Sequence, residues 1–207
     1  MKACSCRSNL SRFAPLLVGL AAFLLTIAHP AASPIQGAGE VLAAAPSRPT
    51  IVIYKAKRRL HYFENDILKK RFSVVLGKRP RGAKQRRGDL KTPEGAYYVT
   101  SKNTRSRFHR FLGLSYPNIR DADRGLVSHI LSRNQYDQIK KAIHGGRQPP
   151  WGTPMGGYVG IHGEGKYRDF TKRHRINWTD GCISLSDSDV KVLFDLVSIG
   201  TPVLIFP

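Results

Sequence analysis

Three short segments between residues 51 and 77 are typical of β-strands, and the second and third place apolar side chains with the two-residue period of a half-buried strand. They read IVIYKA (51–56), LHYFEN (60–65) and ILKKRFSVVLG (67–77). Asn65, the last residue of the second segment, and Asp66, which follows it, are typical of a tight turn. The folded part of the chain should therefore begin near Thr50 with a meander of three short strands.

The remaining sequence adds further strands and two short helices. Extended segments are expected at 96–101, 111–118, 158–163 and 201–206, and loops at 78–95 and 164–178. Ser132 and Gln135 form a capping box before a helix at 136–143, which Gly145 and Gly146 end. Ser186 caps a second helix with an apolar stripe of Val190, Leu193, Phe194 and Val197, which Gly200 ends. The predicted fold class is α+β, mostly β with short helices.

An uncharged apolar run, residues 13–28, follows a short basic stretch that holds Lys2, Arg7 and Arg12. The run is slightly shorter than the roughly 20 residues that a membrane span needs, and it is typical of a secretory signal. Residues 1–28 are therefore expected to be a signal peptide or an uncleaved N-terminal membrane anchor. Residues 29–49, rich in Ala and Pro, are expected to be a linker, and residues 50–207 the folded domain.

The formal net charge is +20, so the surface should attract polyanions. For an exported protein, nucleic acid is an improbable partner. Anionic cell-wall polymers, carboxylate-rich peptides or acidic lipid head groups fit better, and a charge that serves only solubility is the alternative. The basic run at 78–95 allows two interpretations, a solvated loop or an anion-binding loop.

Cys182 is the only cysteine after the apolar run, because Cys4 and Cys6 precede it. An unpaired cysteine in an exported protein suggests a reactive thiol, although a buried cysteine that packs as a small hydrophobe is the alternative. It follows Gly181 just before a helix start, where backbone N–H groups can support a thiolate or an oxyanion. These features predict that Cys182 reacts with iodoacetamide well below the free-thiol pKa of about 8.5.

His162 ends an apolar strand and is followed by Gly163, so its side chain can face a cleft and act as a base. A hydrogen-bonded packing histidine is the alternative. The other histidines and the single exported cysteine lack the spacing of a metal site, and no glycine-rich nucleotide loop is present. No metal and no cofactor are expected.

Five pieces in order resemble the L,D-transpeptidase catalytic domain family: the opening strands, GDLKTPEGAYYV, IHG, TDGCISL and GTPVLIF. The resemblance implies a β-sandwich or barrel-like domain that acts on peptidoglycan stem peptides. It implies that Cys182 is the nucleophile and His162 the general base. It also implies that the Gly163 carbonyl orients the imidazole, and that the amides of Gly181 and Cys182 stabilise an oxyanion.

The sequence departs from the common family pattern at Ser184, where many members carry an arginine that helps to hold substrate. Arg173 or Arg175 could compensate, or both could be solvated charges. The Asp-Gly-Cys form resembles a branch that includes periplasmic murein hydrolases, some of which release a wall-linked lipoprotein. In that branch His109, Tyr116 and Asn118 would line the cleft, and packing in turns and strands is the alternative.

The sequence therefore predicts a cysteine transferase of the L,D-transpeptidase type in the periplasm or cell envelope, active in cell-wall remodelling. An amide hydrolase on the same fold, which trims stems or releases a lipoprotein, is the alternative within enzymes. A non-catalytic cationic wall-binding module is the alternative outside them. The membrane would be contacted only through an N-terminal anchor.

Overall fold

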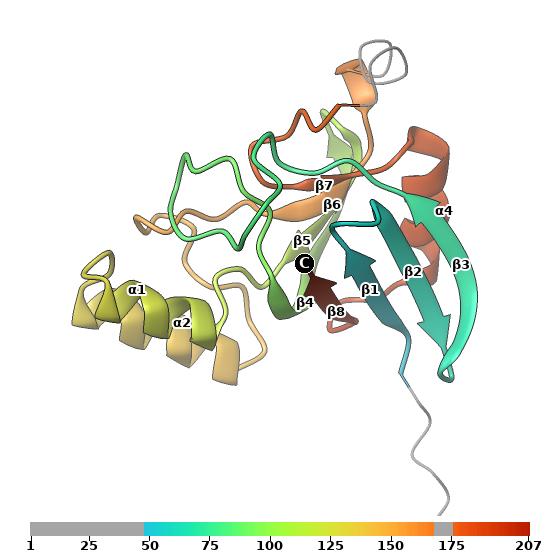
Figure 1. Ribbon diagram of the computed structural model, residues 1–207. Helices are drawn as coiled ribbons and strands as arrows, with labels where there is room; N and C mark the ends of the chain where they lie inside the picture. Colours follow the sequence, from blue (N-terminus) through green and yellow to red (C-terminus); the bar gives the residue numbers. More distant parts are fainter. Residues whose placement is uncertain (1–47, 168–175) are drawn as a thin grey trace, which may run out of the picture. The chain divides into compact units, whose positions relative to one another are not determined.

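The computed structural model describes residues 48–167 and 176–207, which form a sheet of eight strands and a set of short helices (Figure 1). The strands are β1 (Thr50–Tyr54), β2 (Arg59–Glu64), β3 (Ile67–Ser73), β4 (Gly95–Ser106), β5 (His109–Leu114), β6 (Gly160–His162), β7 (Ile183–Ser184) and β8 (Pro202–Phe206). Their order in the sheet is β3-β2-β1-β8-β4-β5-β6-β7. The predicted signal or anchor, residues 1–28, and nearly all of the predicted linker lie outside the described residues.

The first three strands form the predicted meander. β1 pairs antiparallel with β2, and β2 with β3. Asn65 and Asp66 have φ values of 51° and 58°, as the favoured two-residue hairpin turn requires. Ile51, Ile53 and Leu60 are fully buried, so the apolar positions of the alternating pattern face the core.

β8 lies in the middle of the sheet, parallel to β1 and antiparallel to β4. Val203 and Ile205 of β8 are buried in the main hydrophobic cluster. This central position joins the β1–β3 meander to the strands β4–β7. The strand predicted at 201–206 is confirmed, whereas its place between β1 and β4 follows from no local signal.

The two edges of the sheet meet through residues that directly follow β3. The amide of Val75 donates to the carbonyl of Ser184 at 2.9 Å, and the amide of Ser184 donates to the carbonyl of Val75 at 2.9 Å. A second bridge joins Gly77 to Thr179. Figure 1 shows this stretch of chain running alongside β7. We call residues 75–78 and 177–184 the seam; it curls the sheet toward a barrel, and the predicted fold class is confirmed.

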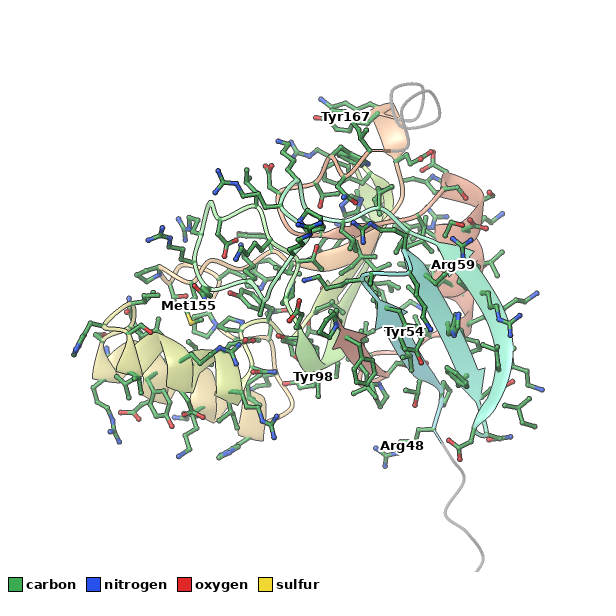
Figure 2. The ribbon with its side chains drawn as sticks, viewed as in Figure 1. Arg48, Tyr54, Arg59, Tyr98, Met155 and Tyr167 are labelled. Atoms are coloured by element: carbon green, nitrogen blue, oxygen red, sulfur yellow. The ribbon has the colours of Figure 1, made fainter. Side chains whose placement is uncertain are left out.

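The described α-helices are α1 (Ile119–Val127), α2 (Arg133–His144) and α4 (Asp187–Leu196), and a 3-10 turn spans Gly165–Tyr167. The predicted caps at Ser132 and Ser186 are confirmed, although α4 ends at Leu196, before Gly200. α1 and α2 pack through a small cluster of Ala122, Leu131, Ile139 and Met155, and Figure 2 shows Met155 beside this pair. None of the helices in the described ranges is long and apolar enough to cross a bilayer.

Helix α1 corrects the expectation that residues 111–118 are extended to their end. β5 stops at Leu114, and Asn118 caps α1 in a capping box with Asp121. The Asn118 side chain also donates to the carbonyl of Ala96 at 3.0 Å. Asp121 is fully buried and accepts a hydrogen bond from the Tyr97 hydroxyl at 2.8 Å, which ties α1 to β4.

The contribution of Asp121 to stability is expected to fall as the pH rises from about 4 to about 6. Burial raises the pKa of this carboxyl to about 6, although hydrogen bonds from Asn118 and Tyr97 and the charge of Arg124 oppose the shift. The folded protein thus binds the proton more tightly than the unfolded chain, so the stabilisation is complete below the unfolded value of 3.8. Two pKa units correspond to about 3 kcal/mol at most.

Urea unfolding of the wild type and of Asp121→Asn between about pH 4 and pH 7 measures this effect. The wild type should lose free energy of unfolding relative to the variant as the pH rises. A difference that stays constant over this range would contradict the raised pKa.

Candidate active site

The register of β6 and β7 brings the two predicted catalytic side chains to one face of the sheet. The strands run parallel, with Ile161 beside Ile183 and His162 beside Ser184. Both isoleucines are fully buried in the main core, so His162 and Ser184 point to the opposite face. Cys182 directly precedes Ile183, and the same alternation places its side chain on the face of His162.

His162 is held in one tautomer by the carbonyl of Gly163. Its Nδ1 lies 2.6 Å from that oxygen, and a carbonyl can only accept, so Nδ1 carries the proton. Nε2 is left with a free lone pair. The Ser184 hydroxyl donates to the same carbonyl at 3.3 Å. The carbonyl of Gly163 is thus fixed from two sides, and the imidazole is oriented as a proton acceptor.

Aromatic side chains from three separate segments enclose the His162 ring. Phe108 stacks on it with ring centroids 4.3 Å apart, and Trp178 meets it edge-on at 5.7 Å. Tyr167, labelled at the 3-10 turn in Figure 2, packs against both Phe108 and Trp178. This cage leaves His162 only 2% exposed.

The cage determines the charge of the imidazole. Burial lowers the pKa of His162 to about 4; the hydrogen bond with Gly163 opposes the shift and the charge of Arg107 adds to it. Desolvation disfavours the cationic form of histidine, as expected for a ring packed against aromatic faces. His162 is therefore neutral at pH 7 and able to accept a proton.

Cys182 is partly buried, and its thiol donates to the carbonyl of Tyr158 at 3.3 Å. Burial raises the pKa of the thiol to about 11, whereas a backbone hydrogen bond from Gly160 and the charge of Lys84 act to lower it. The expectation of a thiol that ionises well below its usual range is therefore wrong. The cause is desolvation, which outweighs the favourable backbone and lysine interactions. The resting pair is a neutral thiol and a neutral imidazole.

Alkylation of Cys182 by iodoacetamide is expected to be slow at neutral pH and to rise up to about pH 11. The reason is that the thiolate, the reactive form, is disfavoured by burial. Mass spectrometry of the adduct against time, from pH 6 to pH 11, measures the rate, with free cysteine as the reference. A rate that levels off below about pH 8 would show a stabilised thiolate instead.

Thr179 shapes the turn that carries Cys182. Its hydroxyl donates to the carbonyl of Cys182 at 2.7 Å and accepts from the amide of Gly181 at 3.3 Å. Gly181 has a φ of 141°, and a Cβ there would lie 2.7 Å from the carbonyl oxygen of Lys91. Glycine is therefore required for the close approach of this turn to the loop before β4. The Gly181 amide, predicted to bind an oxyanion, is engaged by Thr179 in this state.

The thiol faces a cleft of about 500 Å³, whose lining includes Lys84, Arg87, Trp151, Tyr158 and Cys182. The interpretation of residues 78–95 as a solvated loop does not hold for Lys84, which is only 4% exposed. Its Nζ donates to Asp89 at 2.7 Å and to the carbonyl of Arg86 at 3.1 Å. The same carboxylate accepts from the amides of Gln85, Arg86 and Lys91, so the loop forms a fixed wall of the cleft.

Among the described residues, the predicted substrate residues His109, Tyr116, Asn118 and Ser184 are not part of the lining of this cleft. Tyr116 is fully buried, donates to the carbonyl of Met155 at 3.3 Å, and lies under the Nζ of Lys84, 6.0 Å from its ring centroid. Asn118 caps α1, as described above. His109 lies at the β4–β5 turn with a φ of 71°, and its neighbour Phe108 contacts His162. Arg173 and Arg175 lie outside the described residues.

Solved structures provide the first comparison. The fold is similar to the helical cell shape determining protein Pgp2 of Campylobacter jejuni, with a TM-score of 0.50 and 20% identity over 76% of this chain. Bd1075 of Bdellovibrio bacteriovorus has a TM-score of 0.50 and 22% identity over 77%. The chain spans 47% and 48% of these two proteins, about half of their length. At such identities the likeness shows the fold alone.

The family comparison goes further. No curated protein matches the sequence. The model of the L,D-transpeptidase catalytic domain, YkuD, matches residues 48–205, a range that includes the described strands except the last residue of β8, together with the His162 and Cys182 motifs. The match and the geometry of the site together show that the chain belongs to the L,D-transpeptidase catalytic domain (YkuD) family.

Proposed function

We propose that the protein is an exported cysteine acyltransferase that acts on peptidoglycan stem peptides, the substrates of its family. The observation that supports this most is the shared face of β6 and β7. There the neutral His162 and Cys182 lie on the same face, and Cys182 lines a cleft to which two basic residues contribute. A stem peptide carries several carboxylates, and Arg87 is suited to bind one of them, whereas Lys84 is already paired with Asp89 and contributes to the wall of the cleft.

The first half-reaction forms a thioester. The sulfur of Cys182 attacks the carbonyl carbon between a diamino acid and the terminal D-alanine while Nε2 of His162 takes the thiol proton. The carbonyl electrons move to oxygen, and when they return, the amine of D-alanine leaves with the proton from His162. A thiol pKa of about 11 and an imidazole pKa of about 4 favour transfer of the proton as the C–S bond forms over a preformed ion pair.

The second half-reaction transfers the acyl group to an acceptor. An amine of another stem attacks the thioester, gives its proton to His162, and the sulfur of Cys182 leaves and recovers the proton. Water in place of the amine would make the protein a hydrolase by the same steps. The oxyanion would be bound by the amide of Cys182, and by that of Gly181 once it is released from Thr179.

Location in the periplasm or cell envelope is part of this proposal. It rests on the uncharged run at residues 13–28 behind a basic start. The net charge of +20 suits adhesion to an anionic wall.

The test is mass spectrometry of purified muropeptides incubated with the full chain, beside Cys182→Ala. A cross-linked dimer with loss of D-alanine, absent with the variant, is the expected result. Shortened or released stems without dimers would assign water as the acceptor. If wild type and variant both leave the substrates unchanged, including sacculi that carry a bound lipoprotein, the proposal of an enzyme fails and a wall-binding module is the better interpretation.

A further inference from the structure

The loop between β3 and β4 borders a second cavity, which no catalytic step above uses. This cavity has a volume of about 940 Å³. Five of its ten lining residues are cationic and one is acidic. The cations are Lys55, Arg58, Arg79, Arg81 and Lys91, and the acid is Glu94. We call it the basic cavity.

Lys55 organises the basic cavity and neutralises its acid. The Lys55 side chain is 3% exposed, and its Nζ lies 2.6 Å from Glu94. The same Nζ donates to the carbonyl of Gly82 at 2.8 Å and to that of Thr92 at 3.0 Å. All three N–H groups of the ammonium are thus used within the protein. Lys55, which directly follows β1, therefore holds the loop at Gly82 and at its C-terminal end near β4, and it leaves the other four cations to determine the charge of the cavity.

Those four cations have no acidic partner among the described residues. The ion pairs of this part of the chain involve none of Arg58, Arg79, Arg81 and Lys91. The guanidinium of Arg58 donates to the carbonyl of Lys55, and Arg79 and Arg81 are exposed. Like charges gathered round one cavity repel one another, and an anion that enters relieves the repulsion. Guanidinium groups are well suited to carboxylates because they can bind them with two parallel hydrogen bonds.

The basic cavity and the catalytic cleft are close neighbours. Lys91 lines the basic cavity, and its backbone carbonyl packs against Gly181, where a Cβ would lie only 2.7 Å from it. Gly181 and Cys182 line the cleft. Lys91 thus lies between the turn that carries Cys182 and the basic cavity. A polymer with repeated carboxylates that enters the cleft would present further carboxylates near this cavity.

We propose that the basic cavity binds carboxylates of a second peptidoglycan stem peptide, beside the one in the cleft. This inference rests on the proposed function for its substrate class. Arg79 and Arg81 would then help to attach the protein to the polymeric wall. A small soluble substrate, which offers only one stem peptide, would not need these two arginines.

The test compares two charge-matched double variants of the full chain. Arg79→Gln/Arg81→Gln removes two cations from the basic cavity, and Lys69→Gln/Lys70→Gln removes two from the exposed edge strand β3. Each protein is pelleted with purified, lipid-free sacculi at low salt. The cavity variant should bind roughly fivefold more weakly than the wild type, and the β3 variant less than about twofold more weakly. An equal loss in both variants would overturn the proposal, because it would show a general effect of surface charge.

Two further measurements identify the ligand. Sacculi whose carboxylates have been converted to amides should bind the wild type and the cavity variant equally. A difference that persists there would exclude carboxylates as the ligand. Turnover of a single soluble stem peptide should be the same in the wild type and the cavity variant, and a large drop would place these arginines in the catalytic cleft instead. Pelleting is repeated in the Cys182→Ala background, so it remains informative if no turnover is found and the proposed enzyme function fails.

Discussion

Replacing Cys182 by alanine is expected to reduce turnover of stem peptides by more than about 10⁴-fold. The cause is chemical: alanine has no atom that can attack the carbonyl carbon, so no thioester forms. Cys182 contributes one hydrogen bond from its thiol, to Tyr158, so the free energy of unfolding should change by only about 1 kcal/mol. Muropeptide assays measure the first effect and urea unfolding the second.

The control for this variant is binding. Cys182→Ala should still pellet with sacculi as well as the wild type, because the cleft cation Arg87 is unchanged. Residual turnover above about 1% of the wild-type rate would contradict the role of Cys182 as nucleophile.

Replacing His162 by glutamine is expected to lower the rate of thioester formation by roughly 10²- to 10⁴-fold. The glutamine amide can still donate to the carbonyl of Gly163, but it cannot accept the thiol proton. Substrate binding should change little, because His162 is buried beneath Phe108, Tyr167 and Trp178 and does not line the cleft. Single-turnover kinetics with a stem peptide separate the two effects.

The pH dependence provides an independent check on the same residue. With a pKa of about 4, His162 stays neutral down to about pH 5, so wild-type kcat/KM should show no decline near pH 6.5. The free energy of unfolding, by contrast, should decrease as the pH falls from about 6.5 to about 4. In this range the unfolded chain binds a proton on this histidine, whereas the folded protein does not. His162→Gln should lack this component of acid unfolding. An acidic limb near pH 6.5 in the wild type would contradict a buried, neutral imidazole.

Local patterns were sufficient for most of the strands and two of the helices. The meander depends on side-chain alternation and on Asn65 and Asp66, and the caps of α2 and α4 depend on Ser132 and Ser186, all within a few residues of the element they define. Helix α1 was missed because its nine residues bury little apolar surface. The signal that identifies it is Asn118 followed three residues later by Asp121, a capping box.

Long-range packing explains why the site could be predicted only in outline. Cys182 and His162 stand out by their neighbours in sequence, but the direction of the thiol pKa depends on burial created by distant segments. In the sequence Lys84 is one of several charges in a basic loop. Its burial depends on its ion pair with Asp89 in the folded loop, which no local pattern indicates. The aromatic cage of His162 comes from three parts of the chain that no periodicity connects.

The seam has a consequence for the order in which the protein folds. Leu76 and Asn177, which are joined across it by a hydrogen bond of 3.0 Å, lie 101 residues apart. Contacts of such sequence separation form slowly, and β8 must also insert between β1 and β4 before the sheet is complete. A chain that has not closed the seam carries Cys182 as an ordinary thiol with a pKa of about 8.5, open to oxidation. Closure partly buries Cys182 and raises the pKa of its thiol to about 11, so completion of the sheet should also reduce the thiolate form, on which oxidation depends.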